Sequence, residues 1–243
     1  MRRLLPAALA ALMLNAAAHA APTEEGDHVN SYILLDRTGS MSSIWDEALG
    51  SVNAYAASVA ENEDDGPDTL ETRITLAVFD AQDGLEFDVL RRNANADTWT
   101  AVTHDEASPR GMTPLFDAIG EIVSLAEKDA PDKAVLVIMT DGHENASREL
   151  DRKAARAALD RARGRGWEVV FLGAEFADFD DADSVGVSGA QSMAIGKGQF
   201  SESMQRLGKK SRTYGKGESE GVVFDDEDRA IAQEDEVKAR QGQ

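Results

Sequence analysis

Cysteine is absent from all 243 residues of the sequence, which excludes disulfides, thiolate metal sites and a catalytic thiol. Basic residues are scarce, with 25 Lys and Arg against 45 Asp and Glu, and the formal net charge is −20. Because affinity for nucleic acid or for an anionic membrane surface comes mainly from clustered Lys and Arg, neither is expected as a partner. Hydrophobic residues still make up 42% of the chain, which is enough for a folded core.

The N-terminal segment has the features of a secretory signal peptide. Arg2 and Arg3 precede an apolar run from Leu4 to Leu14, and residues 18–20 fit the A-x-A cleavage pattern. This run is too short to span a bilayer, and no later run approaches the roughly 20 residues that a transmembrane helix needs. We therefore expect residues 1–20 to be a signal peptide, with an amphipathic helix as the alternative. The mature protein would be periplasmic or secreted, with no membrane insertion.

Short apolar runs alternate with segments of helical periodicity over residues 29–212. The predicted strands are 32–35, 74–79, 85–90, 134–139, 168–172 and 192–195. The predicted helices are 43–61, 115–126, 147–163 and 200–207. This alternation predicts a doubly wound α/β domain with a mostly parallel central sheet and helices on both faces. The turn at Asp83-Gly84 predicts one antiparallel edge strand, and the most apolar run, 134–139, is expected at the sheet centre.

The last part of the chain differs in composition from the domain. Residues 213–243 are polar and mostly acidic, with the runs DDED at 225–228 and EDE at 234–236. Such charge runs are typical of solvated segments, so we expect a flexible acidic tail or a loosely docked helix. No oligomeric state is encoded in any visible pattern, and a monomer is the simplest expectation.

Three loops place oxygen-bearing side chains where doubly wound sheets bind ligands, at the carboxyl ends of strands. Asp36, Thr38 and Ser40 follow the first predicted strand at positions i, i+2 and i+4. Thr113 lies just ahead of a predicted helix, and Asp141 follows the central strand. Two carboxylates and three hydroxyls, with no sulfur or imidazole, form a hard oxygen site suited to Mg²⁺, Mn²⁺ or Ca²⁺.

Each of these loops also has a purely structural interpretation. Ser40 and Thr113 could be N-caps of the helices that follow them. Asp141 could belong to a turn with Gly142, and Asp36 could be a residue at a strand end. The occurrence of all three loops together, in this order on the strand–helix pattern, favours the metal site.

Other polar motifs constrain function less. His104-Asp105 is similar to the dipeptide of metal phosphohydrolases, but it lacks a second cluster at suitable spacing, and we interpret it as part of a loop. The residues after the third loop, from His143 on, could line the rim of the metal site. Asn145 or Ser147 could equally cap the helix predicted to follow, which is the interpretation that we favour.

The three loops resemble those of a known family. DRTGSM at 36–41, GMTPL at 111–115 and MTDG at 139–142 are similar to the motif loops of a von Willebrand factor type A domain that carries a metal-ion-dependent adhesion site. The likeness is greatest to the stand-alone bacterial and phage members of that family. It implies a Rossmann-like fold over residues 29–212.

The resemblance also implies a role for each residue of the site. Thr38 and Ser40 match the two hydroxyl positions that bind the metal directly, and Thr113 matches the threonine that coordinates in the ligand-competent state. Asp36 and Asp141 match two aspartates that act through water. Many members have Ser where Thr38 stands. Threonine supplies the same hydroxyl, although its β-methyl group restricts the rotamer.

The function implied by the resemblance is that of a binding module. An exported domain would hold a divalent cation, Mg²⁺ before Mn²⁺ or Ca²⁺, and bind a Glu or Asp carboxylate of a partner protein. The alternative in another class is a metal-dependent hydrolase of phosphate or ester substrates, for which the sequence offers no identifiable nucleophile or general base pair. A third possibility is a domain whose loops are only structural.

Overall fold

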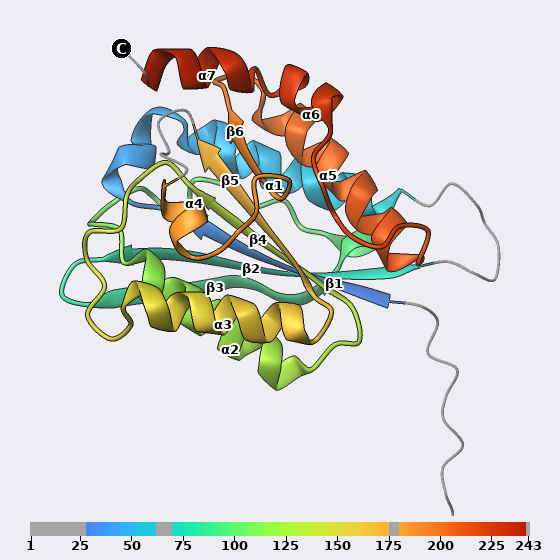
Figure 1. Cartoon of the computed structure of the whole chain (residues 1–243), viewed down its shortest axis with the longest axis horizontal. Coiled ribbons are helices and arrows are strands. Elements are labelled where there is room, and N and C mark those ends of the chain that lie inside the picture. Colours follow the sequence, from blue (N-terminus) through green and yellow to red (C-terminus); the bar gives the residue numbers. More distant parts are fainter. Residues whose placement is uncertain (1–27, 62–69, 175–179, 242–243) are drawn as a thin grey trace, which may run out of the picture.

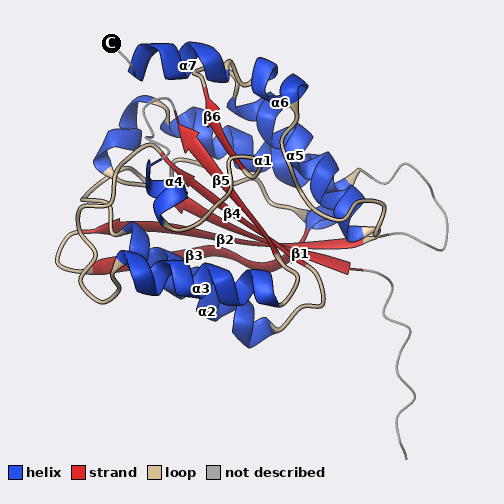
Figure 2. Cartoon of the chain, viewed as in Figure 1, coloured by secondary structure: helices blue, strands red, loops and turns tan. Residues whose placement is uncertain are grey.

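The computed structural model describes residues 28–61, 70–174 and 180–241 (Figures 1 and 2). The expected signal peptide, residues 1–20, lies outside these ranges. The described residues form a six-stranded sheet of order β3-β2-β1-β4-β5-β6. Its strands are β1 (His28–Asp36), β2 (Glu71–Ala81), β3 (Leu85–Asn95), β4 (Ala134–Thr140), β5 (Glu168–Ala174) and β6 (Ser192–Ile195). All neighbouring strands in it are parallel except β2 and β3.

Helices cover both faces of the sheet. They are α1 (Trp45–Ala60), α2 (Leu115–Asp129), α3 (Arg152–Gly164), α4 (Asp180–Ser184), α5 (Phe200–Gly215), α6 (Asp226–Ile231) and α7 (Glu234–Gln241), with the short 3₁₀ helices η1 (Gly39–Ser43) and η2 (Ala96–Thr98). Figure 1 shows α2 and α3 on one face and α1 and α5 on the other. The prediction of a doubly wound, mostly parallel sheet with one antiparallel edge strand is therefore confirmed.

The central strands are apolar throughout because both of their faces are buried. Along β1, Ile33 and Leu35 pack into the core beneath α1 and α5, whereas Tyr32 and Leu34 pack beneath α2 and α3. A strand covered on both sides reads as a continuous apolar run rather than an alternating one. β1 and β4 occupy the middle of the sheet, as the apolar run 134–139 predicts for β4.

Most predicted elements are longer or shorter in the structure, and two predicted helices differ most. The helix expected over 147–163 begins only at Arg152, where the side chain of Asp151 accepts a hydrogen bond from Ala154 N at 2.8 Å. Residues 143–150 are a loop instead, and the side chain of Asp117 in α2 binds the backbone of residues 148–150, as described below. The last predicted helix, 200–207, extends to Gly215 as α5, since its buried face continues through Ser211 and Tyr214.

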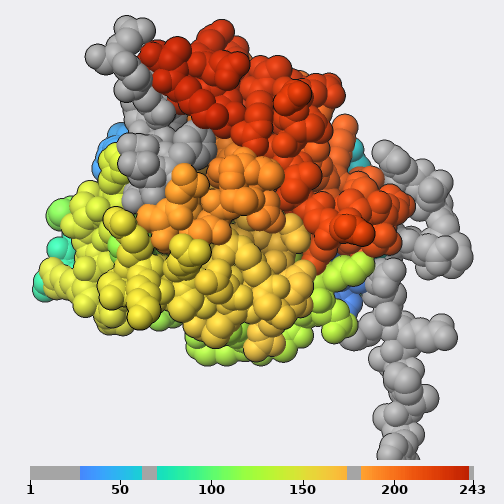
Figure 3. Space-filling model, in the orientation of Figure 1, coloured from blue at the N-terminus to red at the C-terminus, as the bar shows by residue number. Residues whose placement is uncertain are grey.

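The segment after Lys216 packs on the domain rather than extending from it. Figure 3 shows it, in red, lying against α5 and the region of β6. Its apolar side chains are buried; they are Val222, Phe224, Ala232 and Val237. The edge of the sheet is covered here, because Glu234 accepts a hydrogen bond from Ala194 N in β6 and Ala232 O accepts one from Gly196 N. Coverage of an edge strand removes a template for pairing with another chain.

Basic residues balance the acidic groups of this segment. Asp228 is buried and pairs with Arg206 of α5, whose Nε lies 2.6 Å from its carboxylate. Buried Glu234 pairs with Arg229 at 2.8 Å. The acidic composition therefore does not keep the segment in solvent, because Arg206 of α5 and Arg229 of α6 neutralise the carboxylates that become buried.

Candidate metal centre

The three motif loops meet at the carboxyl edge of the sheet. β1 and β4 are parallel neighbours, with Leu35 opposite Met139, so Asp36 and Asp141 leave the sheet side by side. The first loop turns at once into η1, and the second loop precedes α2. The sequence could predict this meeting because the ends of adjacent parallel strands share one edge.

Hydrogen bonds join the side-chain oxygens of the three loops. Ser40 Oγ donates to Asp141 Oδ1 at 2.7 Å and lies 3.1 Å from Thr38 Oγ1. Thr113 Oγ1 donates to Thr38 Oγ1 at 3.3 Å. Asp36 accepts from Thr38 N at 2.7 Å with one oxygen. All five residues expected from the sequence therefore belong to one connected cluster.

The cluster is buried except on one side. Asp36, Thr38, Thr113 and Asp141 are at most 7% exposed, whereas Ser40 is exposed. Burial raises the pKa of Asp36 to about 7, although hydrogen bonds from Thr140 and Thr38 act in the opposite direction. Burial also raises the pKa of Asp141. Ionisation of two neighbouring buried carboxylates is costly, and a cation held between them would offset that cost.

The structural interpretation of two of these residues is wrong. The N-cap residue of α1 is Ile44 and that of α2 is Pro114, and neither cap has a side-chain hydrogen bond. Ser40 and Thr113 do not cap a helix, and their hydroxyls turn toward the cluster instead. Asp36 does hold its own loop through Thr38 N, so its role is partly structural.

Gly142 leaves a small space among these oxygens. A Cβ atom at this position would lie 3.1 Å from Thr113 Oγ1, 3.5 Å from Ser40 Oγ and 3.9 Å from Asp36 Oδ2. One point in the third loop therefore lies close to oxygens from the first and second loops, and hydroxyl and carboxylate oxygens are the donors that hard divalent cations prefer. Among the described residues, no three His, Cys, Asp or Glu side chains gather as a metal cluster. A cation at this place would depend on the hydroxyls, and the residues present fit it.

Asn145 holds Thr113 in place, a role that the sequence did not reveal. Its side-chain oxygen accepts from Thr113 N at 2.9 Å, and its backbone N–H donates to Thr113 O at 3.0 Å. The expectation that Asn145 or Ser147 caps the following helix is wrong, because α3 begins only at Arg152. A cluster of short polar residues outside a helical pattern indicates hydrogen bonds from side chains to the backbone, but it does not indicate which backbone groups are bound.

Two carboxylates clasp the loop after Asp141 to the start of α2. Glu144 accepts hydrogen bonds from Phe116 N at 2.9 Å and from Ser147 N at 2.8 Å. In return, buried Asp117 of α2 accepts from the backbone N–H groups of Arg148, Glu149 and Leu150. We refer to these bonds as the Asp117–Glu144 clasp. The clasp satisfies backbone donors at the start of a helix that has no side-chain cap.

The first and second loops are fixed to each other in a similar way. Arg37 is buried, and its Nε lies 2.6 Å from Asp80 Oδ1, while Arg110 Nε lies 3.1 Å from Asp80 Oδ2. Gly111 has φ +69°, and a Cβ there would lie 2.4 Å from Ala81 O, so only glycine fits. His104, by contrast, is exposed and pairs with neighbouring Asp105 at 3.2 Å, consistent with its interpretation as a loop residue.

The family of the chain follows from a comparison with known families. A model of the von Willebrand factor type A domain matches residues 31–228. The chain belongs to this family. The match extends past the expected boundary at 212 and ends within α6. A search of curated proteins gives no match.

Solved structures show that the fold of this von Willebrand factor type A (vWA) domain is shared. The pilus adhesin SpaC from Lactobacillus rhamnosus GG is 13% identical, with a TM-score of 0.59, over 79% of this chain and 31% of that one. The vWF domain of a type V pili tip protein from Porphyromonas gingivalis is 11% identical, with a TM-score of 0.56, over 82% of this chain and 99% of that one. Proximal thread matrix protein 1 from the mussel byssus is 16% identical with a TM-score of 0.54 over 76% of this chain. The vWA domain spans less than half, 46%, of the mussel protein.

Proposed function

We propose that this vWA domain is an exported binding module that holds a divalent cation and binds an acidic group of a partner protein through it. Mg²⁺ is the first candidate, before Mn²⁺ and Ca²⁺. The observation that carries the proposal is the hydrogen-bonded cluster of side-chain oxygens from the three loops, with Thr113, Ser40 and Asp36 oxygens close to Gly142. The residues proposed to hold the ion are Asp36, Thr38, Ser40, Thr113 and Asp141.

The chemistry of the donors suits adhesion rather than catalysis. A divalent ion held largely by neutral hydroxyls keeps much of its positive charge, which a carboxylate of a partner can neutralise. The Ser40 hydroxyl donates a hydrogen bond to Asp141, so that the lone pairs of the serine oxygen can face the ion position. The exposed side at Ser40 gives a partner access, while the buried residues Asp36 and Thr38 form the base of the site.

The charge of the chain predicts the salt dependence of this binding. With a formal net charge of −20, the domain repels an acidic partner at long range. Salt screens that repulsion over about 8–10 Å at ionic strengths near 0.1–0.15 M. Binding should therefore strengthen from low to moderate salt, and we expect no affinity for nucleic acid.

Export is supported by two independent features. The segment 1–20 has the pattern of a signal peptide, and two of the similar structures are named as a pilus adhesin and a pili tip protein. No helix in the described ranges has the length and apolar character needed to cross a bilayer. We propose a periplasmic or secreted protein that acts as a monomer.

Thermal unfolding of the purified protein tests the proposal. An ion at about a hundred times its dissociation constant adds about 2.7 kcal/mol, or about 5–11 °C for a domain of this size. The scan is run in EDTA and then with each ion, beside the variants Ser40→Ala and Ser42→Ala. Ser42 lies in the same 3₁₀ helix, but its hydroxyl bonds Gly39 O, so its variant is a matched control.

The outcomes separate the proposed functions. A rise in unfolding temperature on addition of an ion supports the cation site if Ser40→Ala abolishes it and Ser42→Ala keeps it. Binding of acidic peptides to the ion-loaded protein then tests the adhesion role. A rise that both variants keep contradicts the assignment of the site. Turnover of a generic phosphoester with Mg²⁺ or Mn²⁺ that disappears in Asp36→Ala would favour the hydrolase instead.

A further inference from the structure

A basic helix lies on the surface of this acidic chain. Residues 152–165, which form α3 and the turn after it, hold six of the 25 basic residues but only one of the 45 acidic residues, Asp160. With the preceding loop included, residues 148–165 hold seven basic and three acidic residues. Figure 3 shows α3, in yellow, on the open surface of the molecule. Because the formal net charge of the chain is −20, this segment is a local exception to its acidic character.

Three of these basic side chains lie together on one side of the first turns of α3. Arg152 and Arg156 are neighbours at i and i+4, and Lys153 lies beside them. All three are exposed. Arg156 Nε lies 3.8 Å from Asp160 Oδ2, whereas the side chains of Arg152 and Lys153 have no ion pair or hydrogen bond within the described ranges. We refer to Arg152, Lys153 and Arg156 as the α3 basic face.

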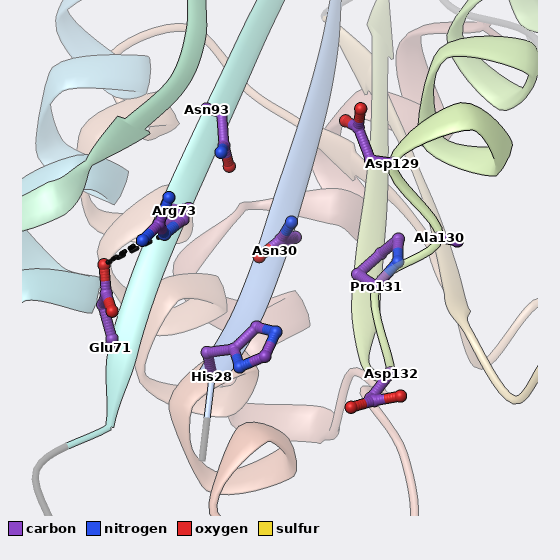
Figure 4. Close-up of a pocket in the computed structure, with 9 residues that line it drawn as sticks. All are labelled: His28, Asn30, Glu71, Arg73, Asn93, Asp129, Ala130, Pro131 and Asp132. Carbon is purple, nitrogen blue, oxygen red and sulfur yellow. Dashed lines mark hydrogen bonds and ion pairs between the residues drawn. The ribbon is translucent and has the colours of Figure 1, made fainter. Parts of the chain in front are cut away.

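Most other arginines in the described part of the chain pair with carboxylates. Figure 4 shows one such pair at the edge of the sheet where the parallel strands begin, which we call the amino edge; Arg73 there lies 2.9 Å from Glu71. On α5, Arg206 pairs with buried Asp228 at 2.6 Å. Those positive charges are neutralised within the chain, whereas the charge of the α3 basic face remains open to solvent.

The stability of the fold gains nothing from the α3 basic face. The positive end of a helix macrodipole lies at its N-terminus, so Arg152 and Lys153 are unfavourable in the first turn of α3. The like charges of Arg152 and Arg156 also repel each other at i and i+4. The first turn holds no acidic residue, and Asp151 at the N-cap offsets part of the cost. Residues that break local rules of stability are expected where function requires them.

The α3 basic face begins close to the metal centre. The third motif loop leads into α3, and Asp117 fixes the end of this loop by accepting a hydrogen bond from Leu150 N at 2.6 Å. Asp117 lies four residues after Thr113 of the metal centre, and Arg152 lies two residues after Leu150. These short segments place Arg152 within roughly 20 Å of Thr113, a distance that about six residues of extended chain span.

We propose that the α3 basic face binds a run of acidic side chains in the partner protein whose carboxylate reaches the metal centre. This inference rests on the proposed function and extends it from a single carboxylate to an acidic segment. Complementary charge supports it, because exposed guanidinium and ammonium groups form charge-assisted hydrogen bonds with carboxylates. The face offsets, near the site, the long-range repulsion between an acidic partner and a chain with a net charge of −20.

Two peptides test the α3 basic face separately from the metal centre. The first carries one Glu, a linker of about six Gly and Ser residues, and a run of four Glu residues. In the second peptide the run of Glu is replaced by Gln. Each peptide is made in both chain directions and is titrated by calorimetry into the protein, once with Mg²⁺ and once with EDTA.

The first peptide should bind about tenfold more tightly than the second, because each of three exposed ion pairs contributes about twofold. The net charge of the chain predicts the opposite order, since added negative charges increase the repulsion. Equal or weaker binding of the first peptide, or no binding of it, would therefore overturn the proposal. If the tenfold difference is present but neither peptide binds more tightly in Mg²⁺ than in EDTA, the proposed function fails and the α3 contact stands.

A pair of double variants locates the contact. Lys153→Gln with Arg156→Gln should remove most of the tenfold difference and should not lower the unfolding temperature, because unfavourable charges leave α3. The control, Lys128→Gln with Lys209→Gln, is an equal loss of exposed charge on α2 and α5 and should keep the difference. Equal losses of binding in the two double variants, or tighter binding of single-stranded DNA than of the first peptide, would overturn the assignment.

Discussion

The two ends of the sheet solve the problem of buried polar groups in different ways. At the carboxyl edge, the oxygens of Ser40, Thr38 and Asp141 bond one another, and further bonds from Asn145 hold the loops. At the amino edge, the side-chain oxygen of Asn30 is buried and has no hydrogen-bond partner within the described residues. The comparison shows that buried polar groups can satisfy one another, as at the carboxyl edge, or can be left unpaired at a cost in free energy. The stability of the carboxyl edge should therefore depend on the residues that support its loops.

The largest effect is expected from a change that forces the second loop away from the end of β2. Gly111→Ala places a Cβ where Ala81 O lies 2.4 Å away, at a φ of +69°. Strain and collision together should cost about 4 kcal/mol, measured as a fall in the free energy of unfolding. Gly84→Ala is the control, since φ there is +121° but nothing lies within 4 Å. It should cost about 1–2 kcal/mol, and equal losses would show that the loops are not held by this close contact.

The next effect concerns the Asp117–Glu144 clasp. Asp117→Ala leaves the N–H groups of residues 148–150 without their acceptor and should cost about 2–3 kcal/mol in chemical denaturation. Glu121→Ala, on the exposed side of the same helix, should cost less than about 0.5 kcal/mol. Similar losses of unfolding free energy in the two variants would mean that the clasp does not stabilise the carboxyl edge.

Replacement of Asn145 should have a smaller effect on stability but a clear effect on the affinity for the divalent cation. Asn145→Ala removes the acceptor of Thr113 N and should lower affinity for the divalent cation by about tenfold, as a change of outer support does at metal sites. Asn145→Asp keeps an acceptor at the same place and should restore most of the affinity. Titration of each variant with Mg²⁺ measures this affinity. An affinity unchanged in Asn145→Ala would show that Asn145 does not support the site.

The smallest effect is a pH dependence at the amino edge. A hydrogen bond from Arg92 holds the pKa of Asp129 below its usual value. Because the carboxylate is favoured in the folded state, its contribution is present above the ordinary pKa near 4 and is lost as the pH falls below it. Arg92→Gln should remove about 1 kcal/mol at neutral pH and flatten this part of the acid unfolding curve. The exposed Arg152, changed to Gln, is the control and should leave the curve unaltered.

Much of the fold was predictable because its signals are local. The alternation of apolar runs with helical periodicity predicts a doubly wound sheet, and the Asp83-Gly84 turn predicts the antiparallel edge strand. Helix starts were harder to predict. Asp151, not Asn145 or Ser147, is the N-cap of α3, and the backbone just before it is bound by Asp117 from another helix.

The candidate site was predictable in its members but not in its support. Asp36 and Asp141 come together because strand ends share an edge, a consequence of topology that a sequence pattern carries. Thr113 is held at that edge by the bridge between Met112 and Ala81 at the end of β2. Asn145 was assigned to a cap, since the same short polar side chains serve caps and long-range bonds alike. The acidic segment after Lys216 was expected to be a flexible tail or a loosely docked helix for a related reason. A run of like charges does not reveal the ion pairs that the segment makes with α5.

The sequence by itself determined the order of strands and helices, the three oxygen-bearing loops and the acidic character of the chain. Periodicity, turn chemistry and charge are properties of residues that are close in sequence, so they can be recognised in the sequence alone. Only the tertiary structure decided which groups become buried and with whom they pair. The clasp on α2, the docking of α6 and α7, and the unmet oxygen of Asn30 all depend on residues far apart in the chain. The physical reason is that the cost of an unpaired buried polar group arises only when folding removes water from it.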